Sequence, residues 1–125
     1  MKVATTIVRL LLGLVFLVFG LNGFFHFIPN MAMPAPAVSF FGGLFATGYM
    51  IPLIFATQTI GGILLLSGLF VPLALALLAP VIVNIVLFHL NLAPGGLPIA
   101  VVVALLELFL VWAYRDRFAP MLRAR

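Results

Sequence analysis

The chain of 125 residues contains no cysteine. This absence excludes disulfide bonds, thiol redox chemistry, zinc sites built from thiolates and iron–sulfur clusters held by cysteine. A redox function would therefore depend on a bound cofactor or on a partner protein. The sequence also lacks a phosphate-binding loop, a paired nucleophile and base, and a metal-binding motif. We therefore expect no catalytic residues and no independent enzymatic activity.

Charged residues are scarce as well. They make up 6% of the chain, against 66% hydrophobic residues, and the mean hydropathy is +1.43. In an ordinary soluble domain about a quarter of the residues are charged. This chain cannot cover itself with a polar shell, so the expected partner of its surface is the lipid bilayer. The net charge of +4 forms no basic stripe and no exposed aromatic platform, which argues against binding of nucleic acid.

The sequence does contain long apolar runs. A transmembrane helix needs about 20 mainly apolar residues, and four stretches qualify: about 6–28, 49–70, 73–91 and 97–114. The sequence therefore predicts an all-α fold, an integral membrane four-helix bundle that forms a single domain over residues 1–125. Between the first two spans, the prolines of "PNMAMPAP" favour an extended chain. The following "SFFGGLFATGYM" predicts a short interfacial helix with Ser39 near its N-cap, on the extracytoplasmic side.

The basic residues predict the orientation of these spans. Lys2 and Arg9 flank the start of the first span, and four arginines follow the fourth: Arg115, Arg117, Arg123 and Arg125. The connections at 30–48 and 91–96 carry neither Lys nor Arg, so both termini are expected to be cytoplasmic. A cleaved signal peptide ending at "APA" (35–37) is a less favoured alternative, because that site lies too far beyond the apolar region.

A few amides and imidazoles interrupt the outer halves of the spans. Asn22 and His26 lie one helical turn apart on the first span, and the third span carries Asn84, His89 and Asn91 toward the same side. An apolar pocket with a few convergent polar groups is typical of a ligand site, so Asn22, His26, Asn84 and His89 are candidate ligand-binding residues. The alternative is that these side chains only stabilise helix packing. Two histidines without an acidic neighbour make an incomplete zinc site, and no metal is expected.

Three further polar residues lie within the spans. Glu107 is about 12 Å below the end of its helix, so it is either neutral or paired, and a buried pair with Arg9 is the favoured structural interpretation. The hydroxyl groups of Thr5, Thr6 and Ser67 are other candidate donors. An ionisable residue in a membrane is also a functional candidate by default. Gln58 precedes Gly61 and Gly62, which permit close helix approach, and is expected to face a neighbouring helix.

Four segments together resemble the DoxX family of small bacterial membrane proteins: "RLLLGLVFLVFGLNGFFHF" (9–27), "GYMIPL" (48–53), "GGILLLSGLFVPLAL" (61–75) and "NIVLFHLNLAPGGLP" (84–98). The resemblance implies a four-helix protein of the bacterial inner membrane. It also implies a link to quinone-dependent oxidoreductase systems and to membrane complexes that handle oxidative stress. Such sequences often carry a glutamate before the Gly-rich segment of the second span. Here Gln58 stands in its place and cannot transfer protons.

Three functions follow as hypotheses. The first is a subunit that binds a quinone-like or lipid-like ligand and serves a membrane redox partner protein, with quinone as the candidate cofactor. The second is a structural or assembly subunit without a ligand. The third is a small-solute transporter, which would need a homo-oligomer to form a lumen and lacks the inverted repeats of secondary carriers.

Overall fold

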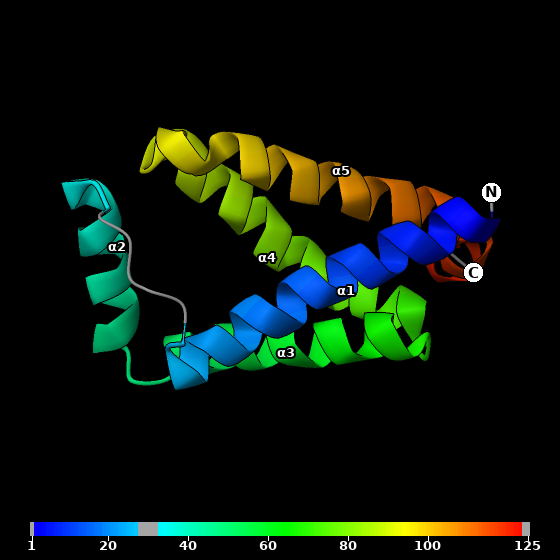
Figure 1. Cartoon of the computed structure of the whole chain (residues 1–125), viewed down its shortest axis with the longest axis horizontal. Coiled ribbons are helices and arrows are strands. Elements are labelled where there is room, and N and C mark those ends of the chain that lie inside the picture. The colour runs from blue at the N-terminus through cyan, green and yellow to red at the C-terminus, as the bar shows by residue number, and fades with distance from the viewer. Residues whose placement is uncertain (1, 28–32, 124–125) are drawn as a thin grey trace.

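The computed structural model describes residues 2–27 and 33–123, which form helices joined by short connections and contain no β-strand (Figure 1). The long helices are α1 (Lys2–Phe25), α3 (Met50–Ser67), α4 (Val71–Asn91) and α5 (Leu97–Ala113). The short elements are α2 (Ala35–Ala46), the 3-10 turn η1 (Pro94–Gly96), α6 (Arg115–Phe118) and the 3-10 turn η2 (Ala119–Leu122). The predicted all-α architecture is confirmed.

Four helices are long and apolar enough to cross a membrane: α1, α3, α4 and the continuous segment Pro94–Ala113. The protein is therefore a multi-pass membrane protein. The helix ends differ from the predicted spans by a few residues. α1 begins at Lys2, because Thr5 and Thr6 continue the helix instead of preceding it. α3 ends earlier than predicted, because Gly68 adopts a positive φ of 75° and its N–H caps the carbonyls of Leu64 and Leu65.

α1 and α3 pack in very close contact along their length (Figure 1). A Cβ atom added to Gly62 of α3 would lie 2.5 Å from the Leu17 nitrogen and 2.8 Å from the Gly13 oxygen of α1. A Cβ atom added to Gly20 of α1 would lie 2.7 Å from the Thr59 nitrogen of α3. Small residues permit this approach of two backbones. The predicted role of the Gly61–Gly62 pair is therefore confirmed, and Gly61 in turn packs against Leu78 of α4.

The remaining contacts define the order of the helices. α4 packs on α3 and α5, whereas α1 contacts α3 and, less extensively, α5. α1 and α4 therefore occupy opposite corners of the bundle. Fully buried leucines from all four long helices fill the centre: Leu12, Leu65, Leu75, Leu78 and Leu110. This core holds α3 and α4 in place as two walls of the site described below.

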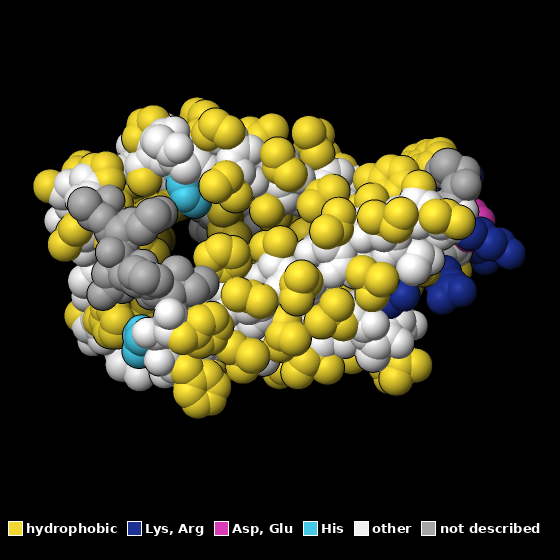
Figure 2. Space-filling model, viewed as in Figure 1, with side chains coloured by type: hydrophobic (Ala, Val, Ile, Leu, Met, Phe, Trp, Pro, Cys, Tyr) yellow, Lys and Arg dark blue, Asp and Glu magenta, His cyan; other side chains and the backbone are white. Residues whose placement is uncertain are grey.

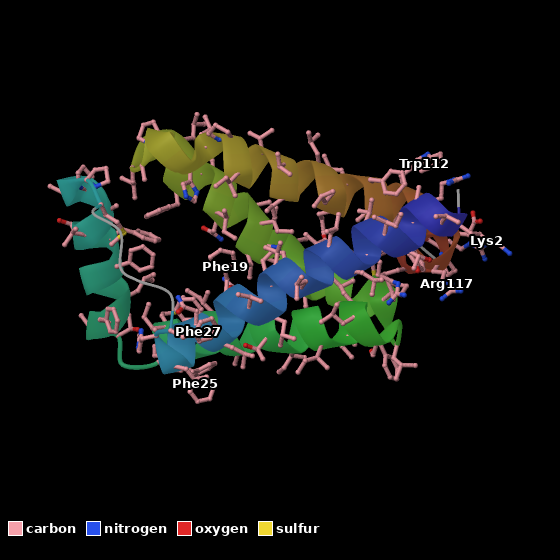
Figure 3. All side chains as sticks on the ribbon, viewed as in Figure 1. Lys2, Phe19, Phe25, Phe27, Trp112 and Arg117 are labelled. Carbon is pink, nitrogen blue, oxygen red and sulfur yellow. The ribbon has the colours of Figure 1, made fainter. Side chains whose placement is uncertain are left out.

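The two ends of the molecule differ in chemistry. Both termini lie at one end (Figure 1), where the Lys and Arg side chains gather in Figure 2, and Lys2, Trp112 and Arg117 lie close to this end in Figure 3. The opposite end carries α2, which begins after Pro34 and not near Ser39 as predicted. With 12 residues, α2 is about 18 Å long and too short to span a bilayer.

Candidate functional site

A cavity of about 760 Å³ lies between α2, α3 and α4, toward the end of the molecule that carries α2. Figure 2 shows the surface hollowed at this end. The lining is mainly apolar and aromatic, with the polar side chains of Gln58, Asn84 and His89 among it. This volume lies within the range of ligand pockets, which are typically apolar with a few placed polar groups. The cavity is therefore the candidate functional site.

Gln58 is the most unusual residue of this lining. It lies within α3, eight residues beyond Met50, so it is about 12 Å from the start of that helix. Its side chain is only 7% exposed, and no hydrogen bond joins its amide to any residue that the structure describes. A buried amide without a hydrogen-bond partner is unfavourable. Gln58 therefore offers both an N–H donor and a carbonyl acceptor to a molecule in the cavity.

His89 directs one ring nitrogen at its own helix and has the other close to Gly96. Its Nδ1 lies 2.8 Å from the Ile85 carbonyl oxygen, and because a carbonyl can only accept, Nδ1 carries the hydrogen. Nε2 of the neutral ring is then an acceptor. The ring edge packs against Gly96, where an added Cβ would lie 2.6 Å from Nε2. The glycine therefore makes room for this ring position.

Asn84 is anchored in a similar way. Its Nδ2 donates to the Pro80 carbonyl at 2.9 Å, which leaves Oδ1 as an acceptor. The same pattern recurs at Asn91, whose Nδ2 donates to the Leu87 carbonyl at 2.9 Å. These side chains bond to the carbonyl four residues earlier in their own helix. These three bonds do not join two helices.

Aromatic rings close the cavity on the α2 side. Phe40 and Phe41 of α2 approach Phe88 of α4 with ring centroids 5.4 Å and 5.3 Å apart. Phe88 in turn meets the His89 ring edge-on, at 5.1 Å. Such edge and tilted contacts are the preferred geometries of aromatic pairs. They attach α2 to α4 and place flat apolar surfaces next to the polar side chains.

The first span does not contribute to this cavity as expected. Asn22 lies on α1 and His26 directly follows it, at the opposite corner of the bundle from α4, and neither lines the cavity. Two separate histidine side chains are visible in Figure 2. His26 is exposed, with a φ of 53°, and its backbone N–H closes the last turn of α1 on the Asn22 carbonyl at 2.8 Å. Phe25 and Phe27 are also exposed, at the end of α1 (Figure 3).

The predicted pair of Glu107 and Arg9 is not formed. The Arg9 guanidinium donates to the Leu65 carbonyl and, at 3.3 Å, to the Leu66 carbonyl. These carbonyls belong to the last turn of α3, where backbone acceptors have no helical partner, so Arg9 caps α3 from α1. Glu107 is 5% exposed, and neither carboxyl oxygen has a hydrogen-bond partner in the described part of the chain. The expected hydroxyl donors do not reach it either, and Ser67 donates to the Leu64 carbonyl.

The four candidate ligand-binding residues are divided between two places in the structure. Asn84 and His89 line one cavity, Asn22 and His26 do not, and Gln58 joins the cavity although it was assigned to packing. The signal for Gln58 was present, because a lone amide in the middle of an apolar span requires a partner. No cluster of three metal-ligating side chains occurs within residues 2–27 and 33–123.

Comparison with known families decides the classification. The family model for DoxX matches residues 4–91. The chain belongs to the DoxX family. The match covers α1 to α4, and therefore every helix that lines the cavity of this DoxX protein, whereas α5 and Glu107 lie beyond it. Neither the curated proteins nor the solved structures include a match to the chain.

Proposed function

We propose that this DoxX protein binds a quinone-like or lipid-like ligand in the cavity between α2, α3 and α4 and serves a membrane redox complex. The observation that supports this proposal is the Gln58 amide, which is buried in the bundle without a hydrogen bond to the described residues and lines a cavity of about 760 Å³. A ligand with a polar ring and an apolar tail would satisfy this amide. It would also fill the aromatic surface next to it.

The polar groups of the cavity suit the two oxidation states of a quinone. The Gln58 N–H can donate to a ring carbonyl, and Nε2 of the neutral His89 can accept from a quinol hydroxyl. Phe41 and Phe88 would contact the faces and edges of the ring. The lining contains no arginine, lysine or acidic residue. A neutral ligand therefore fits the cavity better than an anionic one.

The cellular setting is part of the same proposal. The described Lys and Arg residues lie at or near the end that holds both termini (Figure 2), which by the positive-inside rule makes this end cytoplasmic. The cavity would then lie toward the outer face of a bacterial inner membrane. Because the chain has no cysteine, electrons would reach a bound quinone from a partner protein.

The alternative of a structural subunit without a ligand makes a different prediction for Gln58. If the Gln58 amide has no ligand, replacing it would change the stability of the protein and would not change the binding of any ligand. If it contacts a ligand, Gln58→Leu should remove a hydrogen bond to that ligand. The same change should also remove an amide that makes no hydrogen bond to the described residues, and so stabilise the ligand-free protein.

We therefore expect Gln58→Leu to raise the melting temperature of the ligand-free protein and to weaken ubiquinone-1 binding by about tenfold. Binding would be measured by titration of the purified protein in nanodiscs, with native mass spectrometry to identify co-purifying quinones. Asn91→Ala is the matched control, because Asn91 makes the same type of side-chain bond as Asn84 but lies outside the cavity. Equal ubiquinone binding by the wild type and Gln58→Leu would refute the proposed site.

A further inference from the structure

A second cavity, of about 420 Å³, lies between α4, α5 and the segment that follows α5. Aliphatic side chains of α4 form most of its wall, Val111 and Glu107 belong to α5, and Phe118 and Met121 come from α6 and η2. Glu107 is the only charged or polar side chain of this lining. The proposed ligand site does not use it. The role of the Glu107 carboxyl group is therefore considered separately from the ligand site.

The carboxyl group of Glu107 has no counter-ion within the described chain. Neither oxygen makes a hydrogen bond. Arg9, the basic residue nearest to the middle of α1, is committed to the Leu65 and Leu66 carbonyls. At the cytoplasmic end, Arg115 donates to the Trp112 carbonyl at 2.8 Å, and Arg117 lies over the Tyr114 ring. An unpaired carboxylate buried in an apolar bundle is highly unfavourable, so the ionised form of Glu107 requires a counter-ion, which a positive charge in the cavity would supply.

The backbone of α4 adds a second acceptor to the same wall. Pro80 has no N–H, so the Ala76 carbonyl, four residues earlier, loses its usual helical donor. Ala76 and Pro80 both line the cavity. The lining side chains other than Glu107 are Leu, Ala, Pro, Val, Phe and Met, and none of these donates a conventional hydrogen bond. The cavity thus combines acceptor groups with aliphatic and aromatic surface, to which Phe118 contributes its ring.

We propose that this cavity binds a lipophilic ammonium ion, with the N–H groups of the ammonium against the Glu107 carboxylate and the apolar part of the ligand along α4. The Glu107 side chain lines the cavity, and neither of its carboxyl oxygens has a hydrogen-bond partner in the described part of the chain. An ammonium ion carries the positive charge and the N–H donors that complement the acceptors of this cavity, and a neutral lipid lacks this charge. The site is independent of the cavity that contains Gln58, Asn84 and His89.

The test uses the full-length protein in zwitterionic nanodiscs and radiolabelled 3-phenylpropylammonium, measured by scintillation proximity with the signal of empty nanodiscs subtracted. The neutral alcohol 3-phenylpropanol has a similar shape and serves as the competitor without charge. We expect saturable ammonium binding by the wild type and weak competition by the alcohol. Glu107→Gln keeps the shape of the side chain and removes its charge, and should weaken ammonium binding on the order of thirtyfold or more.

Two further variants keep the result decisive. Ala76→Phe fills the cavity from its exposed wall, retains the carboxylate and should abolish ammonium binding even if Glu107→Gln folds poorly. Asn91→Ala lies outside both cavities and should bind the ammonium like the wild type. The proposal is overturned if the wild type shows no saturable binding or if Glu107→Gln binds equally well. It is also overturned if the alcohol competes as strongly as the ammonium itself. None of these results would affect the quinone proposal, which is tested at Gln58.

Discussion

Most polar side chains of the long helices are satisfied within their own helix. Thr57 donates to the Leu53 carbonyl at 2.8 Å and Thr59 to the Phe55 carbonyl at 2.8 Å, as Asn84 and Asn91 do on α4. Bonds of this kind make a polar residue tolerable in lipid without any neighbouring helix. Gln58 and Glu107 are buried, and the two carboxyl oxygens of Glu107 have no partner in the described part of the chain. These two residues, and not the polar residues as a class, are therefore the ones on which we base the two proposals.

The Arg9 side chain joins two helices, α1 and α3, by hydrogen bonds. Because it donates to carbonyls that end α3, Arg9→Gln should lower the free energy of unfolding by about 1–3 kcal/mol, the value of hydrogen bonds from a charged donor. Arg9→Lys should recover part of this loss. The measurement is thermal unfolding in detergent followed by circular dichroism, with the exposed Arg117→Gln as control. A melting temperature of Arg9→Gln equal to that of the control would contradict the assigned role.

At the scale of elements, α1 and α3 share the most extensive contact among the described helices. It depends on glycines whose missing side chains let one backbone lie against the other. A backbone cannot move aside as a flexible side chain can. The stability of this helix pair should therefore be sensitive to a single methyl group.

Gly62→Ala tests this contact. Alanine is favoured over glycine in a helix by about 1 kcal/mol, but its methyl group would lie 2.5 Å from the Leu17 nitrogen. We expect the steric clash to dominate and the variant to lose about 1–3 kcal/mol of stability. Gly42→Ala on α2 is the matched control, because a Cβ atom there meets nothing within 4 Å, and should unfold at or slightly above the wild-type temperature. Stabilisation of both variants would show that the close contact does not persist in the membrane.

The positions of the membrane spans could be predicted from the sequence, whereas the packing of one helix against another could not. Length and apolar composition identify a span from the chain alone, which is why all four long helices were found. Helix ends depend on local caps, so the positive φ of Gly68 shortened α3. The pairing of α1 with α3 depends on the fit of two surfaces. Because α1 and α4 are diagonal, Asn22 and His26 were grouped wrongly with Asn84 and His89, whereas Gln58, on the adjacent α3, was not placed with them.

At the scale of the whole molecule, the fold has one basic end and one aromatic end. Both termini and most of the basic side chains lie together, and α2 with Phe40 and Phe41 lies at the other end (Figures 1 and 2). An even number of membrane-spanning helices requires this arrangement of termini. The asymmetry of basic residues then selects which end faces the cytoplasm.

The absence of native cysteine makes this orientation simple to measure. In intact cells, we expect Ala46→Cys at the end of α2 to react with a membrane-impermeant maleimide. Lys2→Cys and Arg123→Cys should react only after the membrane is permeabilised, because we place both termini in the cytoplasm. All three positions are exposed in the structure. Labelling of Lys2→Cys or Arg123→Cys in intact cells would contradict the proposed orientation.

The preference of α1 for α3 has a consequence during synthesis on the ribosome. α1 is made first, yet the carbonyls that receive Arg9 and the glycine surface that fits Gly13 belong to the second long helix to emerge. Until α3 is synthesised, the Arg9 guanidinium of α1 lacks the carbonyl groups to which it donates in the folded protein. Among the four long helices described here, α1 and α3 are therefore the first pair that can pack together as they are synthesised.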